Sequence, residues 1–211
     1  EKLIRTEPDN ADLWQRLGFS LQKQKKYAEA VKAYMQADIL RPDHIWTLKH
    51  LAQCHKRMHA YEQALEYFRK VEEMQPDNLN LLLQIGQCLA TLRLYDKALS
   101  YFFKVEYLEK APENAQRAIG WCYFMTGEYE KALNFYQKLL HSASPQTNDY
   151  LNAGHVYTAL QNIPQAIECY RKAEKQCSTH EEFIKLYLAD KEALIEQHIP
   201  TETIYLMPDL L

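Results

Sequence analysis

The sequence predicts an all-α protein, an α-solenoid of five helical hairpins followed by a capping helix. Aromatic and small residues recur every 34 residues over most of the chain, and apolar residues within each repeat follow helical spacing. The third observation is composition, because only five Gly and eight Pro occur among 211 residues. That content argues against a β-sandwich rich in tight turns and against a disordered linker protein.

Four columns of residues define the repeat. An aromatic residue begins the second half of each repeat at Tyr27, and the same position is Tyr61, Tyr95, Tyr129 and finally Ile163. Alanine stands three positions later in every repeat, and a larger aromatic residue follows four positions after the alanine. Upstream, a small residue recurs with the same period at Gly18, Ala52, Gly86, Gly120 and Gly154. So many matching columns predict one structural unit repeated five times without insertion.

Each repeat reads as two amphipathic helices joined by a short turn. Trp14, Leu17 and Leu21 share one helical face, and a second apolar face starts at Tyr27. The small residue lets the two helices approach closely, and the large aromatic ring fills the space beside it. Because Pro cannot continue a helix, Pro42 is predicted to end the second helix of the first repeat. One hairpin cannot bury its apolar face alone, so the repeats are expected to stack.

This pattern resembles the tetratricopeptide repeat family, whose unit is 34 residues long. The resemblance rests on Trp14-x-x-Leu17-Gly18-x-x-Leu21, then Ala30-x-x-x-Tyr34, then Pro42. It implies a right-handed superhelix of antiparallel hairpins, with the first helix of each hairpin lining a concave groove where ligands bind. The predicted divisions are the end of a preceding repeat at 1–10 and five repeats over 11–180, at 11–44, 45–78, 79–112, 113–146 and 147–180.

The two ends of the chain depart from the repeat. Thr179 and Glu182 form a capping-box pattern, which predicts a polar-backed capping helix over 181–199. Residues 200–211 are an apolar tail. This tail either packs on the cap or is disordered, or it is a linear motif that docks in a groove of its own chain or of a neighbouring copy.

Composition excludes several functional classes. The net charge of −3 provides no general attraction for nucleic acid, and the sequence contains no apolar run long enough to insert in a membrane. We find no catalytic motif and no metal or cofactor site: His55 and His59 have metal-ligand spacing, but the fold directs them to a packing column and a turn. The five cysteines show no framework typical of secreted proteins, which favours a reducing, cytoplasmic location.

The resemblance predicts which side chains line the groove. The first two repeats concentrate basic residues there, and the fourth adds an aromatic patch of Trp121, Phe124 and Met125. The alternative is that the basic residues are ordinary solvated positions and that Trp121 packs on the next repeat. The predicted peptide-binding residues are Arg16, Phe19, Lys23, Trp46, Lys49, Gln53, Lys56, Arg57, Gln84, Gln87, Arg117, Trp121, Phe124, Asn152 and His155.

The sequence therefore favours a protein-interaction scaffold over an enzyme. The expected ligand is a peptide or partner protein with acidic residues at one end and an apolar anchor at the other. A chaperone-tail adaptor is disfavoured, because Gln53 and Gln84 replace the expected asparagines and Ala118 replaces a cation. Two alternatives stay open: a regulatory or substrate-presenting region of a larger enzyme, and self-association through the tail.

Overall fold

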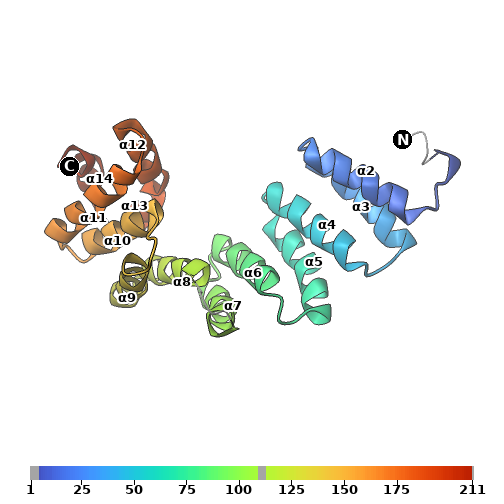
Figure 1. The fold of residues 1–211 in the computed structure, drawn as a ribbon, viewed down its shortest axis with the longest axis horizontal. Helices are drawn as coiled ribbons and strands as arrows, with labels where there is room; N and C mark the ends of the chain where they lie inside the picture. The colour runs from blue at the N-terminus through green and yellow to red at the C-terminus, as the bar shows by residue number, and fades with distance from the viewer. Residues whose placement is uncertain (1–4, 109–112, 211) are drawn as a thin grey trace. The chain divides into compact units, whose positions relative to one another are not determined.

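The computed structural model describes residues 5–108 and 113–210 and consists of helices joined by short turns (Figure 1). Five consecutive antiparallel helix pairs account for most of it. Their bounds are α2 Ala11–Lys23 with α3 Tyr27–Leu40, α4 Ile45–Arg57 with α5 Tyr61–Met74, α6 Leu79–Thr91 with α7 Tyr95–Leu108, α8 Glu113–Met125 with α9 Tyr129–Leu140, and α10 Thr147–Ala159 with α11 Ile163–Gln176. The all-α prediction of successive helical hairpins is confirmed.

The chain divides into two compact units, Glu1–Glu109 and Lys110–Leu211, which we call unit 1 and unit 2. Unit 1 holds the first three helix pairs, and unit 2 holds the last two pairs with the C-terminal helices. The predicted boundary between the third and fourth repeats lies at the edge of segment 109–112, outside the described residues, as do residues 1–4 of the predicted partial repeat.

The helices follow the 34-residue period of the sequence. Both the first helices and the second helices of the five pairs begin 34 residues apart, and each turn between them places one residue in the left-handed region. These turn residues are Lys25, His59, Arg93, Gly127 and Gln161, with φ between 59° and 77°. Only one of them is Gly, although the left-handed region is costly for other residues.

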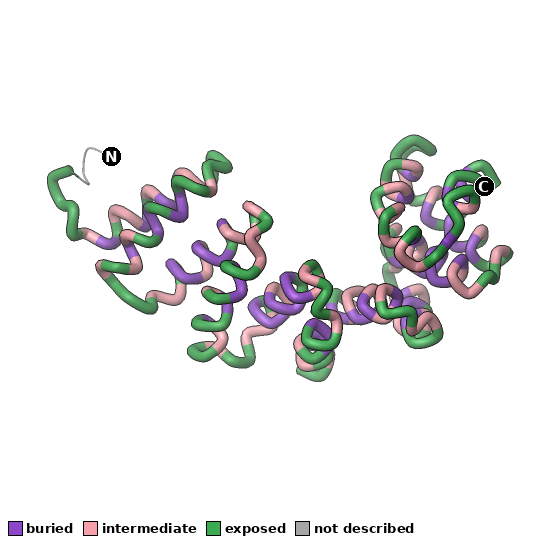
Figure 2. Tube along the Cα trace, turned by 180° about the vertical axis from the view of Figure 1, so that it is seen from behind, coloured by how far each residue is buried: buried purple, intermediate pink, exposed green. Residues whose placement is uncertain are grey.

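Contact between a glycine and an aromatic ring sets the separation of the two helices in most pairs. A Cβ atom added to Gly86 in α6 would lie 2.4 Å from Cε1 of Phe102 in α7. Gly18, Gly120 and Gly154 face Tyr34, Tyr136 and Tyr170 in the same way. Buried residues therefore lie on the sides of the helices that face each other within each unit, and exposed residues lie outside (Figure 2).

The C-terminal segment differs from the single capping helix predicted over 181–199. Two helices stand there, α12 His180–Ala189 and α13 Lys191–Glu196, with Asp190 between them. Thr179 caps α12 as the sequence predicted, because its hydroxyl accepts a hydrogen bond from the Glu182 amide at 3.1 Å. The backbone departs from helical geometry at Asp190, whose carboxylate reaches back toward His155 of α10.

The apolar tail packs on its own unit. It forms α14 Thr201–Leu206 and the 3₁₀ turn η1 Pro208–Leu210, and it buries Ile204 and Met207 in the core of unit 2. Among the tail residues that the structure describes, the large apolar side chains of Tyr205, Leu206 and Leu210 stay exposed. Of the alternatives for the tail, the structure therefore shows packing against unit 2.

No helix of the described residues combines the length and apolar character needed to cross a bilayer. Within 5–108 and 113–210, no cluster of three or more His, Cys, Asp or Glu side chains could hold a metal ion.

Candidate functional site

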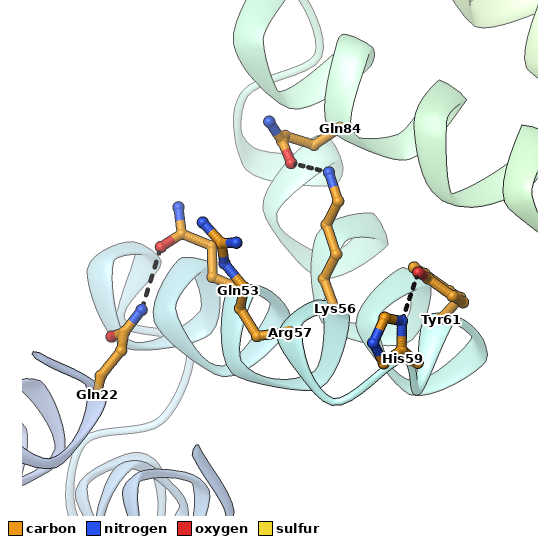
Figure 3. Close-up of a pocket in the computed structure, with 7 residues that line it drawn as sticks. All are labelled: Gln22, Gln53, Lys56, Arg57, His59, Tyr61 and Gln84. Atoms are coloured by element: carbon orange, nitrogen blue, oxygen red, sulfur yellow. Dashed lines mark hydrogen bonds between the residues drawn. The ribbon is translucent and has the colours of Figure 1, made fainter. Parts of the chain in front are cut away.

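The first helices of unit 1, α2, α4 and α6, carry a polar pocket of about 580 Å³. Figure 3 shows its walls, with the long side chain of Lys56 extending toward α6 and the guanidinium of Arg57 beside Gln53. The lining residues are Gln22, Gln53, Lys56, Arg57, His59, Tyr61 and Gln84. Four of the predicted site residues, Gln53, Lys56, Arg57 and Gln84, therefore come together in one cavity.

Lys56 is held by neutral acceptors. Its ammonium donates to the amide oxygen of Gln84 at 2.6 Å and to that of Gln87 at 2.8 Å. Burial lowers the pKa of Lys56, and the positive charge of Arg57 also lowers it. The two amides accept hydrogen bonds from the Lys56 ammonium but do not neutralise its charge. An anion in the pocket would therefore stabilise the charged form of Lys56.

Four further cations lie on the same helices. Lys49 donates to the amide oxygen of Gln75 at 2.8 Å, again a neutral partner. Within the described part of the chain, no carboxylate lies within salt-bridge distance of any of the five. The five cations are Arg16, Lys23, Lys49, Lys56 and Arg57. A concentration of unpaired positive charge favours a negatively charged ligand.

Two exposed rings, which we call the aromatic ledge, adjoin these cations. Phe19 of α2 and Trp46 of α4 are 40% and 38% exposed, with ring centroids 6.1 Å apart. Lys23 places its ammonium 5.1 Å from the Phe19 centroid. A pocket of about 310 Å³ opens here, between the two rings, Asp12, Gln15 and Arg16. Exposed aromatic surface beside cations can anchor an apolar side chain of a ligand.

Hydrogen bonds connect the ledge to the polar pocket. His50 packs against Trp46, with ring centroids 4.0 Å apart and the rings tilted by 50°, and its Nδ1 lies 2.7 Å from the amide oxygen of Gln22. Tyr34 donates to the same oxygen at 2.9 Å, and the Gln22 amide group donates to Gln53 at 3.5 Å. Burial, followed by the nearby Lys23, lowers the pKa of His50. The peptide-binding residues predicted from the sequence do not include His50, although it sits between both parts of the site.

Arg117 in unit 2 was predicted to bind a ligand, but its guanidinium is already engaged. Nε and Nη2 donate to the two carboxylate oxygens of Asp149, at 2.7 Å and 3.0 Å. The Asp149 side chain is fully buried, and the Arg117 side chain is only 19% exposed. A bidentate pair of this kind is a structural link between α8 and α10, because breaking it would leave a buried charge.

Phe124 and His155 were also predicted to line the groove, and both are fully buried. The residues at the same repeat positions in unit 1 are partly or fully exposed; Gln22, for example, corresponds to Phe124, and Phe19 corresponds to His155. In unit 2, however, Tyr187 and Asp190 of the C-terminal segment lie against His155, whose ring is also near Phe124. These two predictions are wrong as ligand contacts, since no partner could reach the side chains.

Trp121 and Asn152, the remaining predicted residues in unit 2, stay partly exposed. They line a small pocket together with Asn148, Leu186, Ala189 and Asp190. The repeat pattern could not predict the α12 residues of this pocket, because α12 lies outside the 34-residue period.

Comparison with known proteins identifies the repeat. Four family models, each described as a tetratricopeptide repeat, match residues 9–77, 51–115, 115–144 and 150–180. No curated protein sequence matches the chain.

Solved structures share the fold at low sequence identity. A tetratricopeptide repeat protein from Parabacteroides merdae ATCC 43184 is 19% identical, with a TM-score of 0.75 and coverage of 98% of this chain and 87% of that chain. YrrB, described as a protein with an unusual peptide-binding site, is 20% identical, with a TM-score of 0.68 and coverage of 88% and 95%. PilW, described as a type IV pilus biogenesis factor, is 15% identical, with a TM-score of 0.69 and coverage of 89% and 90%.

Proposed function

The chain belongs to the tetratricopeptide repeat family, and from this premise we propose that unit 1 binds an acidic segment of a partner protein on α2, α4 and α6. In this proposal the chain acts by binding and not by catalysis. The similarity to YrrB, a repeat protein with a peptide-binding site, supports a peptide or protein as the ligand. Fold similarity alone does not specify the ligand chemistry, which comes from the side chains of unit 1.

The observation that carries the proposal is the set of five cations without carboxylate partners. A lysine on a helical surface can pair with an acidic residue one turn away, as Lys172 does with Glu168. Here, Lys49 and Lys56 use glutamine amides instead, so their charge is oriented but not cancelled. A carboxylate entering the pocket would accept charge-assisted hydrogen bonds from Lys56 and Arg57.

The aromatic ledge adds a second requirement on the ligand. Phe19 and Trp46 would cover an apolar side chain, while the polar pocket receives an acidic one. In this proposal the apolar anchor of the ligand binds in unit 1, and not at the patch of Trp121, Phe124 and Met125 that the sequence predicted. A ligand with an aromatic or aliphatic residue next to acidic residues fits both.

The test is a titration with labelled peptides followed by fluorescence anisotropy. One peptide carries several glutamates and a single phenylalanine; its companions replace the glutamates with glutamine or the phenylalanine with serine. Variants Lys56→Gln and Trp46→Leu are compared with Lys32→Gln, an exposed cation on the second helix α3. Loss of one charge-assisted hydrogen bond, about 1.5–3 kcal/mol, corresponds to roughly tenfold or more in affinity.

Tighter binding of the acidic, aromatic peptide, weakened by both site variants and not by the control, would support the proposal. Binding that is equal for the glutamine peptide, or equally reduced by Lys32→Gln, would refute a specific acidic site on this face. Circular dichroism of each variant verifies that a loss of binding is not a loss of fold.

A further inference from the structure

Unit 2 contains a second pocket of different chemistry, with a volume of about 230 Å³. Trp121 of α8 and Asn148 and Asn152 of α10 form one side, and Leu186, Ala189 and Asp190 at the end of α12 form the other. This volume is below the range of typical small-molecule sites and suits a single side chain. No lysine, arginine or histidine is among the lining residues.

Asp190 supplies a carboxylate with one oxygen uncommitted. Its Oδ2 lies 3.3 Å from Nε2 of His155, whose Nδ1 lies 3.0 Å from the Tyr170 hydroxyl. Its Oδ1 has no hydrogen-bond partner among the described residues. The Asp190 side chain is 31% exposed, so the carboxylate is partly accessible to a ligand.

Asn148 and Asn152 add side-chain amides to the lining of the pocket. An asparagine side chain carries an amide oxygen with two lone pairs, which can accept hydrogen bonds from a guanidinium.

Asp190 is the one charged side chain among the residues that line the pocket. Burial raises the pKa of Tyr136 and Tyr170 most strongly, and the negative charge of Asp190 adds to the effect at both hydroxyls. Arg117, on the same helix as Trp121, is neutralised by its bidentate pair with Asp149. The pocket thus combines an aromatic side chain, a carboxylate oxygen and an amide oxygen, with no cation of its own.

We propose that this pocket binds the guanidinium of an arginine on a partner protein. A guanidinium is planar and donates several hydrogen bonds, so it can stack on Trp121 while donating to Asp190 and Asn152. The proposal uses no residue of unit 1, so it stands or falls separately from the acidic-peptide site.

The probe is the short peptide acetyl-Gly-Arg-Gly-amide, and the readout is the indole N–H resonance of Trp121 in the ¹⁵N-labelled full chain, assigned with Trp121→Phe. The matched control peptide carries citrulline, which has the shape of arginine without its charge. A saturable shift with the arginine peptide and none with citrulline is the expected result. No shift with arginine, or the same shift with citrulline, would overturn the proposal.

Asp190→Asn tests the carboxylate, because asparagine keeps an acceptor for His155 while removing the charge. The variant is expected to weaken arginine binding about tenfold, the loss of one charge-assisted contact. Asp209→Asn, at an exposed carboxylate of the tail, is expected to leave binding unchanged. Unweakened binding in Asp190→Asn would refute the role of the carboxylate. If that variant does not fold, Trp121→Leu, followed by calorimetry, takes its place.

Discussion

Gly86→Ala should destabilise unit 1, although alanine is normally the better helix former. The new Cβ would lie 2.4, 2.8 and 2.9 Å from Cε1, Cδ1 and Cζ of Phe102. Carbon atoms in good contact lie about 3.5–4.0 Å apart, so the closest of these contacts is too short by more than about 1 Å. The Phe102 ring is only 1% exposed and is surrounded by packed neighbours, so it cannot simply swing into solvent.

The magnitude follows from two opposing effects. Overpacking a core with one methyl costs about 1–3 kcal/mol, and replacing Gly by Ala inside a helix returns about 1 kcal/mol. With three ring atoms in conflict, the net loss should be about 1–2 kcal/mol. Thr91→Ala, at the exposed end of α6, should change the stability by less than about 0.5 kcal/mol.

A double-mutant cycle with Phe102→Leu tests the cause, with urea unfolding followed by circular dichroism as the assay. If the ring is what the methyl meets, the double variant should lose at least about 1 kcal/mol less than the sum of the single losses. Additive losses, or a Gly86→Ala variant as stable as the parent protein, would refute the close-contact explanation of this column.

Three further outcomes follow from the same structure. Lys25→Gly should raise the free energy of unfolding by about 0.5–1 kcal/mol, because Lys25 has φ of 61° and the left-handed region is unfavourable for residues other than glycine. An unchanged or lower midpoint in urea unfolding would contradict this. Asp149→Ala should cost unit 2 roughly 3 kcal/mol by leaving Arg117 without its buried partner, and a loss below about 1 kcal/mol in urea unfolding would show that the pair is dispensable. Iodoacetamide at pH 8 should modify the partly exposed Cys177 well before Cys122, since burial raises the pKa of the Cys122 thiol to about 12; mass spectrometry that finds Cys122 labelled equally fast in the native protein would refute that reasoning.

The repeat architecture could be predicted because it depends on local and periodic information. Helix pairing needs a small residue such as Gly86 opposite a ring such as Phe102, and both recur at fixed positions in the sequence. The basic surface of unit 1 could be predicted from the same periodicity, because the repeat pattern assigns Lys56 and Arg57 to the exposed side of the first helix. Gln84 lies on the first helix of the next repeat, so stacking of the repeats brings it into contact with Lys56.

The errors arise where the chain departs from its period. His155 and Phe124 occupy columns that are open in unit 1, but the C-terminal helices cover them in unit 2. Such contacts join residues far apart in sequence, as when Gln197 donates to the backbone carbonyl of Met125 at 3.2 Å. Arg117 was misassigned for a related reason: the residues equivalent to its partner Asp149 in the other repeats are Leu13, Thr47, Leu81 and Ala115, none of them acidic, so the periodic pattern did not predict the pair.

The two amides that hold Lys56 have a consequence for the thermodynamics of binding. A free lysine side chain loses up to about 2 kcal/mol of rotamer entropy when a ligand fixes it. Gln84 and Gln87 have already restricted Lys56 in the unliganded protein, while leaving one of its three N–H donors for an incoming oxygen. When an acidic segment binds, most of the conformational entropy should therefore be lost by the peptide and little by Lys56. Making the peptide more rigid should then strengthen binding more than adding contacts to it.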